Sequence, residues 1–251
     1  MNRLELFRGL GNLDADLIRE AEAPPARKQK KRWQIALPIA ACLALAIGIG
    51  TSSILYAQNS IELSPESEGV RARYVHNAPE VSTAGSLLPL TEAEMFTRFD
   101  TAIFRGTVTQ VENIRLDFAG ETVYRAIAHI HTEEVYRGNC RAGEDVRVLL
   151  PCTIGTGEAV TDTAVASAMR PGMTGIFMPI QYGEDDYWEQ NGARLREKDL
   201  CAYGLADGER WAFLETGDGL LFDRTAFPTI AGADTLMEVE DYILKMVDPA
   251  E

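Results

Sequence analysis

Three side chains with metal-binding chemistry recur at every second position of one predicted strand. His129, His131 and Glu133 follow one another in AHIHTEE, inside a strand predicted over residues 123–136. Alternation along a strand places all three on one face, and Zn²⁺ accepts imidazole and carboxylate ligands. The opposite face holds core-type side chains: Tyr124, Ala126, Ala128 and Ile130. Because no fourth ligand is evident, the sequence favours a solvent-facing, metal-free strand over a metal site.

A second group of polar residues combines acids with aromatic rings. Residues 184–188 read EDDYW and follow a predicted strand, so we expect a loop there. Carboxylates bind Ca²⁺, but no EF-hand spacing is present, and such charge runs are usually solvated. Tyrosine and tryptophan are enriched at protein interfaces. We therefore predict that Tyr187 and Trp188 contact a partner.

No motif in the chain specifies a reaction. The patterns G-x-S-x-G and H-E-x-x-H are absent, as is any Cys/His nucleophile arrangement. The segment Gly155-Thr156-Gly157 is too short for a phosphate-binding loop and has no following lysine. The sequence therefore predicts no catalytic residue and no cofactor, and an enzyme of unknown type is only an alternative.

The elements that position these residues are mainly strands. Alternating patterns predict strands over Ala102–Ile114, Val123–Tyr136, Asp145–Leu150 and Thr174–Gln181, with a bulge or bend at Gly106. Two Asp-Gly pairs, Asp207-Gly208 and Asp218-Gly219, predict hairpin turns.

Two helices complete the predicted fold. Thr91 and Glu94 form a capping box that opens a short helix. Asp234–Val247 is a C-terminal amphipathic helix, and its predicted buried stripe is Leu236, Val239, Ile243 and Met246. The fold class is therefore mainly β (α+β): an antiparallel barrel with a C-terminal helix.

One long apolar run predicts a membrane anchor. No charged residue occurs from Trp33 to Ile61, and Arg27–Arg32 reads RKQKKR. Trp33–Ala57 exceeds the roughly 20 residues that a helix needs to cross a bilayer, and the basic cluster should stay cytoplasmic. The prediction is a single span with a cytoplasmic N-terminus and an extracytoplasmic C-terminal domain. A signal peptide cleaved after Leu55-Tyr56-Ala57 is the competing interpretation.

The anchor divides the chain into regions of opposite charge. Residues 1–32 are a cytoplasmic tail with eight Lys/Arg and five Asp/Glu, a net of +3. Residues 58–251 hold the remaining 16 Lys/Arg and 33 Asp/Glu, a net of −17. A charge of −17 repels phosphate backbones, which excludes nucleic acid as an outer partner. Residues 58–90 are a predicted linker or stalk with an edge strand near Val70–Val75, and 91–251 is the extracytoplasmic domain.

The tail and the span carry two further interaction signals. Residues 2–22 predict one or two short helices, which either dock on a cytoplasmic partner or belong to a partly ordered tail. Ala40, Ala44 and Gly48 recur every four residues, a spacing that lets two membrane helices approach closely. The same spacing arises by chance in an alanine-rich segment.

The outer region contains three cysteines, Cys140, Cys152 and Cys201. An odd number cannot pair completely within one chain. Either Cys152 and Cys201 form a disulfide, or all three are buried or free thiols.

The order of strand motifs carries a resemblance. AIFRGTVTQVENI, a turn, YRAIAHIHTEEVYRG, EDVRVLLP and PGMTGIFMPI follow one another in the chain. This order resembles a recurrent bacterial surface domain, which is similar to the OB-like barrels of the netrin and tissue-inhibitor type. The match covers about residues 95–225 and lacks the paired cysteines of the netrin type. The tail, basic cluster and single span also resemble uncharacterised single-pass membrane proteins of Gram-positive bacteria. Neither resemblance implies catalytic residues.

These observations favour a membrane-anchored binding or sensing module. An OB-like domain on a membrane tether would engage an extracytoplasmic protein or glycan ligand, and the lipid bilayer is its other partner. The alternative is an anti-sigma-like signalling regulator that acts through its N-terminal tail.

Overall fold

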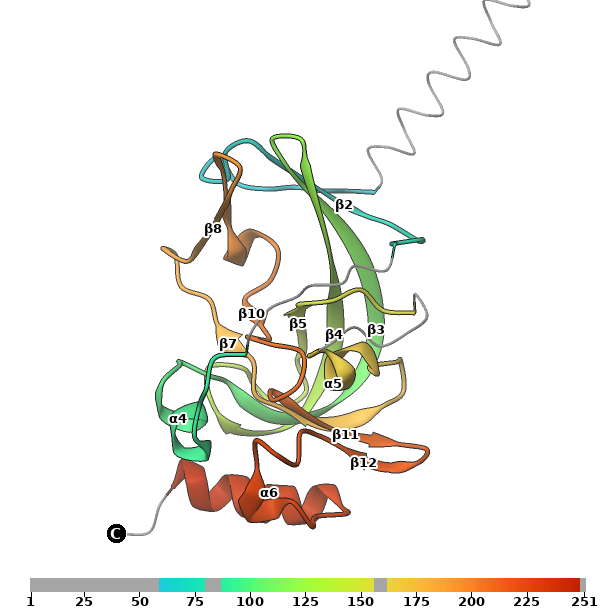
Figure 1. The fold of residues 1–251 in the computed structure, drawn as a ribbon, viewed down its shortest axis with the longest axis vertical. Coiled ribbons are helices and arrows are strands. Elements are labelled where there is room, and N and C mark those ends of the chain that lie inside the picture. The colour runs from blue at the N-terminus through green and yellow to red at the C-terminus, as the bar shows by residue number, and fades with distance from the viewer. Residues whose placement is uncertain (1–58, 80–86, 156–161, 249–251) are drawn as a thin grey trace, which may run out of the picture. The chain divides into compact units, whose positions relative to one another are not determined.

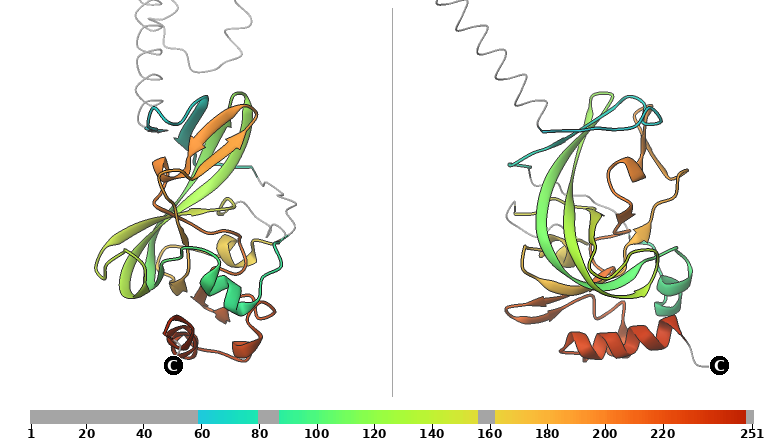
Figure 2. Two further views of the ribbon diagram at one scale, coloured as in Figure 1. Left: turned by 90° about the vertical axis from the view of Figure 1, so that its left-hand side faces the viewer. Right: turned by 180° about the vertical axis from the view of Figure 1, so that it is seen from behind.

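The structure, a computed structural model, describes residues 59–79, 87–155 and 162–248. These residues belong to one compact unit, Tyr56–Glu251. The unit is mainly β: one large sheet curls into a half-barrel, and a C-terminal helix lies across its lower end (Figures 1 and 2). The predicted fold class, mainly β with a C-terminal helix, is confirmed at this level.

A long hairpin forms the spine of the sheet. Strands β3, Ile103–Phe118, and β4, Glu121–Arg137, pair antiparallel over their whole lengths. The pairing register shifts between Arg105 and Gly106, which confirms the predicted irregularity there. Both strands are longer than their sequence patterns indicated.

The sheet curls because the segment 174–181 pairs with the first and the last strand of one series. Strand β5, Asp145–Leu150, pairs antiparallel with β4, and β10, Tyr203–Gly204, pairs parallel with β5. The predicted strand 174–181 is split at Met178-Pro179 into β6, Thr174–Phe177, and β7, Ile180–Gln181. Strand β6 pairs with β3 while β7 pairs with β10. This one short segment therefore contacts both ends of the β3-β4-β5-β10 series.

The two predicted Asp-Gly turns have different outcomes. Asp218-Gly219 joins β11, Ala212–Thr216, to β12, Gly219–Leu221, as predicted. The hairpin predicted at Asp207-Gly208 is wrong, because β10 pairs with β5 and β11 pairs with β6. Asp207 instead caps the bend with its carboxylate, which accepts hydrogen bonds from Arg210 and Trp211.

Part of the predicted linker 58–90 belongs to the sheet, which corrects that prediction. Strand β1, Ser60–Ile61, pairs with β2, Val70–Tyr74, and β2 pairs with β3 along its whole length. The edge strand expected near Val70–Val75 is thus present. The loop between β1 and β2 is held by Asp199, whose Oδ2 accepts bonds from the hydroxyls of Ser64 and Ser67, both at 2.6 Å.

Helices cover one end of the half-barrel. The predicted capping box at Thr91 opens α4, Glu92–Thr97, and α5, Ala164–Ser167, is a single turn. The C-terminal helix α6, Leu236–Val247, buries Leu236, Val239 and Ile243 as predicted, while Met246 is only partly buried. Two 3₁₀ turns, η1 Glu197–Asp199 and η2 Pro228–Ile230, complete the described elements.

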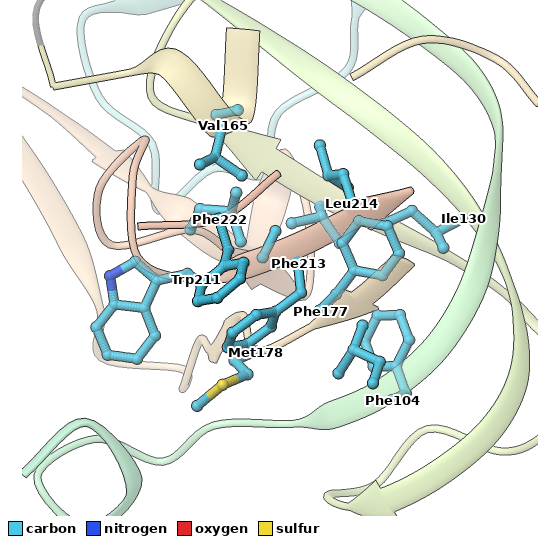
Figure 3. Packing of buried hydrophobic residues seen from close by; sticks show 14 of the residues in the cluster. Phe104, Ile130, Val165, Phe177, Met178, Trp211, Phe213, Leu214 and Phe222 are labelled. Carbon is cyan, nitrogen blue, oxygen red and sulfur yellow. The ribbon is translucent and has the colours of Figure 1, made fainter. Parts of the chain in front are cut away.

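The core has two parts, and β4 contributes to both. Its Ala126, Ala128 and Ile130 belong to the larger cluster. Figure 3 shows Ile130 near Phe177 of β6 and Phe213 of β11. Ile127 points the other way, into a smaller cluster under β2 and β9, Ala193–Arg196. Strand β4 is therefore buried on both faces at its centre. Arg125 and His129, which flank Ile127 on the face of the smaller cluster, are only half-buried.

The predicted membrane segment lies outside the described residues. The tail 1–32, the span 33–57 and the small-residue series Ala40, Ala44 and Gly48 all precede Asn59, the first described residue. Within the described part of the chain, no helix combines the length and apolarity needed to cross a bilayer.

Candidate functional site

The predicted metal candidates lie on one face of β4 but bind separate neighbours. His129 Nε2 lies 3.0 Å from Glu112 Oε2, and His131 Nδ1 lies 2.8 Å from Asp145 Oδ1. Glu133 instead accepts a hydrogen bond from β3. His131 is exposed, as expected, whereas His129 is half-buried. The described residues contain no group of three or more His, Cys, Asp or Glu side chains arranged to hold a metal ion.

The predicted partner-contact residues do not lie on an open loop. They begin β8, Tyr187–Gln190, which forms a small hairpin with β9. Both rings are half-buried. The Trp188 ring centroid lies 4.9 Å from that of Phe118, and the guanidinium carbon of Arg194 lies 3.4 Å from the Tyr187 ring centroid. The loop expectation is correct for residues 184–186 and wrong for Tyr187 and Trp188, because these two residues belong to a hairpin that packs their rings against other side chains of the domain.

Tyr187 and Trp188 do line a cavity of about 480 Å³. Its wall is built by β4, β5, β7, β8 and the chain on either side of β10. The lining residues are Arg125, Leu149, Leu150, Pro151, Ile180, Tyr182, Tyr187, Trp188, Glu189, Glu197, Leu205 and Ala206. Small-molecule sites are typically cavities of roughly 300–1,000 Å³ with apolar and aromatic walls and a few polar groups. The lining of this cavity, hereafter the Arg125 cavity, combines apolar and aromatic side chains with polar groups in similar proportion, and the cavity is open to solvent.

Arg125 is the cationic group of the cavity wall. It lies on β4, two residues before the buried Ile127 and on the same face. Its guanidinium carbon lies 4.9 Å from the Trp188 ring centroid, and its Nη1 donates a 2.8 Å bond to the Tyr124 carbonyl. Burial lowers the pKa of Arg125, since desolvation disfavours the charged form. The domain therefore holds a cation in a partly dry site.

No described carboxylate forms an ion pair with Arg125. Other shielded arginines differ in this respect. Arg210 Nη2 lies 2.7 Å from Asp207 Oδ2, and Arg196 Nη2 lies 2.8 Å from Asp199 Oδ1. A desolvated charge is costly unless it is paired and hydrogen-bonded. Among the described side chains, Arg125 thus has no carboxylate within 4 Å as an ion-pair partner.

A tyrosine and a glutamate form the opposite side of the cavity. The Tyr182 ring lies directly on the backbone of Gly204, and a Cβ at position 204 would collide with the Tyr182 hydroxyl. That hydroxyl is hydrogen-bonded to Glu197. Burial raises the pKa of both Tyr182 and Glu197. Because glycine leaves room for the ring, Gly204 fixes the place of this wall.

A second cavity, of about 430 Å³, adjoins the first. Arg125, Pro151 and Ala206 line both cavities. The second one is also bounded by the bend in which Asp207 binds Arg210 and Trp211. Arg125 therefore borders two hollows in the same region of the domain.

The cysteines are not part of a reactive site. Cys140, Cys152 and Cys201 are all free and buried, so the Cys152–Cys201 disulfide does not form and the alternative of buried thiols is confirmed. Burial raises the pKa of Cys152 to about 11 and that of Cys201 to about 12. Thiols with raised pKa values are poor nucleophiles at neutral pH.

Arg125, Tyr182 and Glu197 are not among the site residues that the sequence predicts. One signal was present: Arg125 interrupts the apolar series VYRAIAHI at a position that shares a face with Ile127. The rest of the site comes from β7, β8 and η1, which are far along the chain. No local pattern indicates that these elements meet.

Comparisons with known proteins give no relative. The chain matches no protein-family model, no curated protein and no solved structure. The function of the domain is therefore inferred from its geometry.

Proposed function

We propose that the chain is a single-pass, membrane-anchored, extracytoplasmic binding module whose ligand site is the Arg125 cavity. The observation that carries the proposal is a partly buried arginine with no ion-pair partner among the described residues, in a cavity that also presents aromatic and apolar side chains. Binding sites characteristically combine apolar walls with a few convergent polar groups. Trp188 and Tyr187 are the aromatic part of this wall.

We also propose that the curled sheet is an OB-like barrel. The strands β3, β4, β5, β6–β7 and β10 would be its five strands, and β10 enters between β5 and β7, which is a Greek-key order. OB folds bind ligands on the face of their second and third strands and with neighbouring loops. The Arg125 cavity lies against β4 and β5 and the connection between β7 and β10, which supports the same use here.

The membrane location is supported by the sequence. The charge-free run Trp33–Ala57, the basic cluster Arg27–Arg32 and the acidic outer domain favour an extracytoplasmic binding domain. Cysteine labelling of intact cells tests this. A cysteine introduced at Glu62 should react with an impermeant maleimide, while one at Asn2 should not. The reverse pattern would contradict the membrane orientation without bearing on the cavity.

A screen of small organic molecules tests the binding function. The melting temperature of the purified full-length chain would be measured with each compound, since a ligand of the folded state raises it. Ala206 is exposed and lines the cavity, so Ala206→Phe should fill the cavity and abolish the shifts. Ala202→Phe is the matched control at an exposed alanine outside the lining, and it should retain them. Hits that survive Ala206→Phe, or a screen without hits, would contradict the proposal.

A further inference from the structure

Resting on the proposed binding function, we infer that the ligand of the Arg125 cavity is a small monocarboxylate whose carboxylate binds Arg125 and whose apolar body lies along Trp188. The inference names a ligand class rather than a compound. Three features of the cavity support it: the unused N–H donors of Arg125, the apolar and aromatic side chains of the lining, and the lining carboxylates of Glu189 and Glu197.

The donors of Arg125 are largely unused. A guanidinium has five N–H donors, and a single bond, from Nη1 to the Tyr124 carbonyl, engages Arg125 among the described residues. Arg137, in contrast, donates to the carbonyls of Phe96 and Thr101 and to the Thr101 hydroxyl. The remaining donors of Arg125 are therefore free to bind an acceptor that enters the cavity.

A carboxylate matches these donors in geometry and charge. The planar guanidinium fork forms two parallel hydrogen bonds with a carboxylate. Charge-assisted bonds of this kind are roughly twice as strong as neutral ones. A bound carboxylate would also give Arg125 the direct ion-pair partner that it lacks among the described side chains.

The remaining lining residues indicate the chemistry of the ligand apart from its carboxylate. Pro151 and Ile180 are apolar and partly exposed, and the Trp188 ring lies near the guanidinium. Glu189 and Glu197 line the same cavity. A second negative charge on the ligand would face these acids, in a domain that already carries excess negative charge. A single carboxylate on an apolar or aromatic body fits these walls better than a dianionic phosphate.

Three probes of similar size separate these chemistries: 4-phenylbutyrate, its neutral amide 4-phenylbutyramide, and phenyl phosphate. Each would be titrated calorimetrically into the full-length chain in nanodiscs of neutral lipid, with empty nanodiscs as the reference. We expect 4-phenylbutyrate to bind at least about tenfold more tightly than either other probe. Arg125→Met should remove this preference, and Arg125→Lys, which keeps the charge without the fork, should reduce it. Arg71→Met changes an exposed arginine outside the cavity and should leave the preference unchanged.

The outcomes distinguish the inference from the function on which it rests. Equal binding of the acid and the amide would overturn the carboxylate assignment while leaving a binding cavity in place. Tighter binding of phenyl phosphate would overturn it in favour of a dianion. An acid preference that persists in both Arg125→Met and Arg125→Lys, or no binding of 4-phenylbutyrate, would also overturn it. The cavity itself is judged separately, by the Ala206→Phe and Ala202→Phe pair.

Discussion

The guanidinium carbon of Arg125 lies 4.9 Å from the centroid of the Trp188 ring. This contact joins β4, in the spine of the sheet, to the β8–β9 hairpin. In the cavity lining, this contact places the cationic Arg125 beside the aromatic ring of Trp188. The thermodynamic and binding properties expected of the domain follow from this pair and the groups around it.

Arg125 should lower the stability of the ligand-free protein. A shielded charge without an ion-pair partner carries a desolvation cost, and an apolar side chain of similar length removes that cost. We therefore expect Arg125→Met to keep or raise the melting temperature, with a gain of up to about 2 kcal/mol in the free energy of unfolding. Differential scanning calorimetry without ligand measures this.

Arg210→Met is the matched control for that substitution. Arg210 is paired with Asp207 at 2.7 Å, and both side chains are at most one-tenth exposed. Its loss leaves a buried carboxylate unpaired and should cost about 3 kcal/mol. A loss of similar size for Arg125→Met would mean that Arg125 is a structural residue, contrary to the account.

Gly204→Ala should disturb the cavity through Tyr182. A methyl group at position 204 collides with the Tyr182 hydroxyl, so the ring must move away from Glu197. We expect a loss of about 1–3 kcal/mol in stability, as for other overpacked sites, and at least about tenfold weaker binding of a cavity ligand. Gly217→Ala, where an added Cβ meets nothing within 4 Å, should change neither property. Unchanged ligand affinity in a folded Gly204→Ala protein would show that the Tyr182 wall does not contact the ligand.

Asp199 should make stability depend on acidic pH. Burial raises its pKa, but hydrogen bonds from Ser64, Ser67 and Arg196 lower it further, to about 2 from an ordinary 3.8. A carboxyl group with a depressed folded-state pKa stabilises the protein above its unfolded pKa, and this stability is lost as the pH falls towards the folded value. Asp199→Asn should therefore cost about 2 kcal/mol at pH 7, and the cost should shrink between about pH 4 and pH 2. Urea unfolding of both proteins across this range gives the comparison, and a cost independent of pH would contradict the role of the ionised carboxylate.

Local patterns predicted much of this fold. Alternation identified β3, β4 and β5, and the capping box at Thr91 and three of the four predicted stripe residues of α6 were correct. These features depend on residues close together in the chain. The Asp207-Gly208 turn was wrong because β10, next to it, pairs parallel with the distant β5. The composition of 58–90 suggested a linker because the bonds that hold its first part come from Asp199 and β3.

The candidate site was harder to predict for the same reason. Trp188 was selected for its ring type but was assigned to an exposed loop, because no signal indicated the hairpin that turns it inward. Arg125 belongs to no recognisable sequence motif. Its importance comes from what surrounds it: Trp188, Tyr182 and Ala206 are all more than fifty positions away. His129 and His131 formed the conspicuous local pattern, and the structure gives each a separate partner.

Substitution of both histidines by glutamine should have small effects. His131 is exposed, and each histidine makes one contact with one carboxylate. Exposed pairs contribute roughly 0–1 kcal/mol, so the double variant should melt within a few degrees of the natural protein. The melting temperature of both proteins should be unaffected by EDTA. A chelator-sensitive melting temperature that is lost in the double variant would reveal a metal site.

Fluorescence of Trp188 tests the central claim most directly. The chain has three tryptophans, Trp33, Trp188 and Trp211, and of the two that the structure describes, Trp188 lines the Arg125 cavity. Titration of the full-length chain with 4-phenylbutyrate should change its emission saturably, because the ligand body lies along the Trp188 ring. The same titration of Trp188→Phe, which keeps an aromatic wall, should show no such change although calorimetry still detects binding. A saturable change of equal size in both proteins, or none in the natural protein, would contradict a ligand site between Arg125 and Trp188.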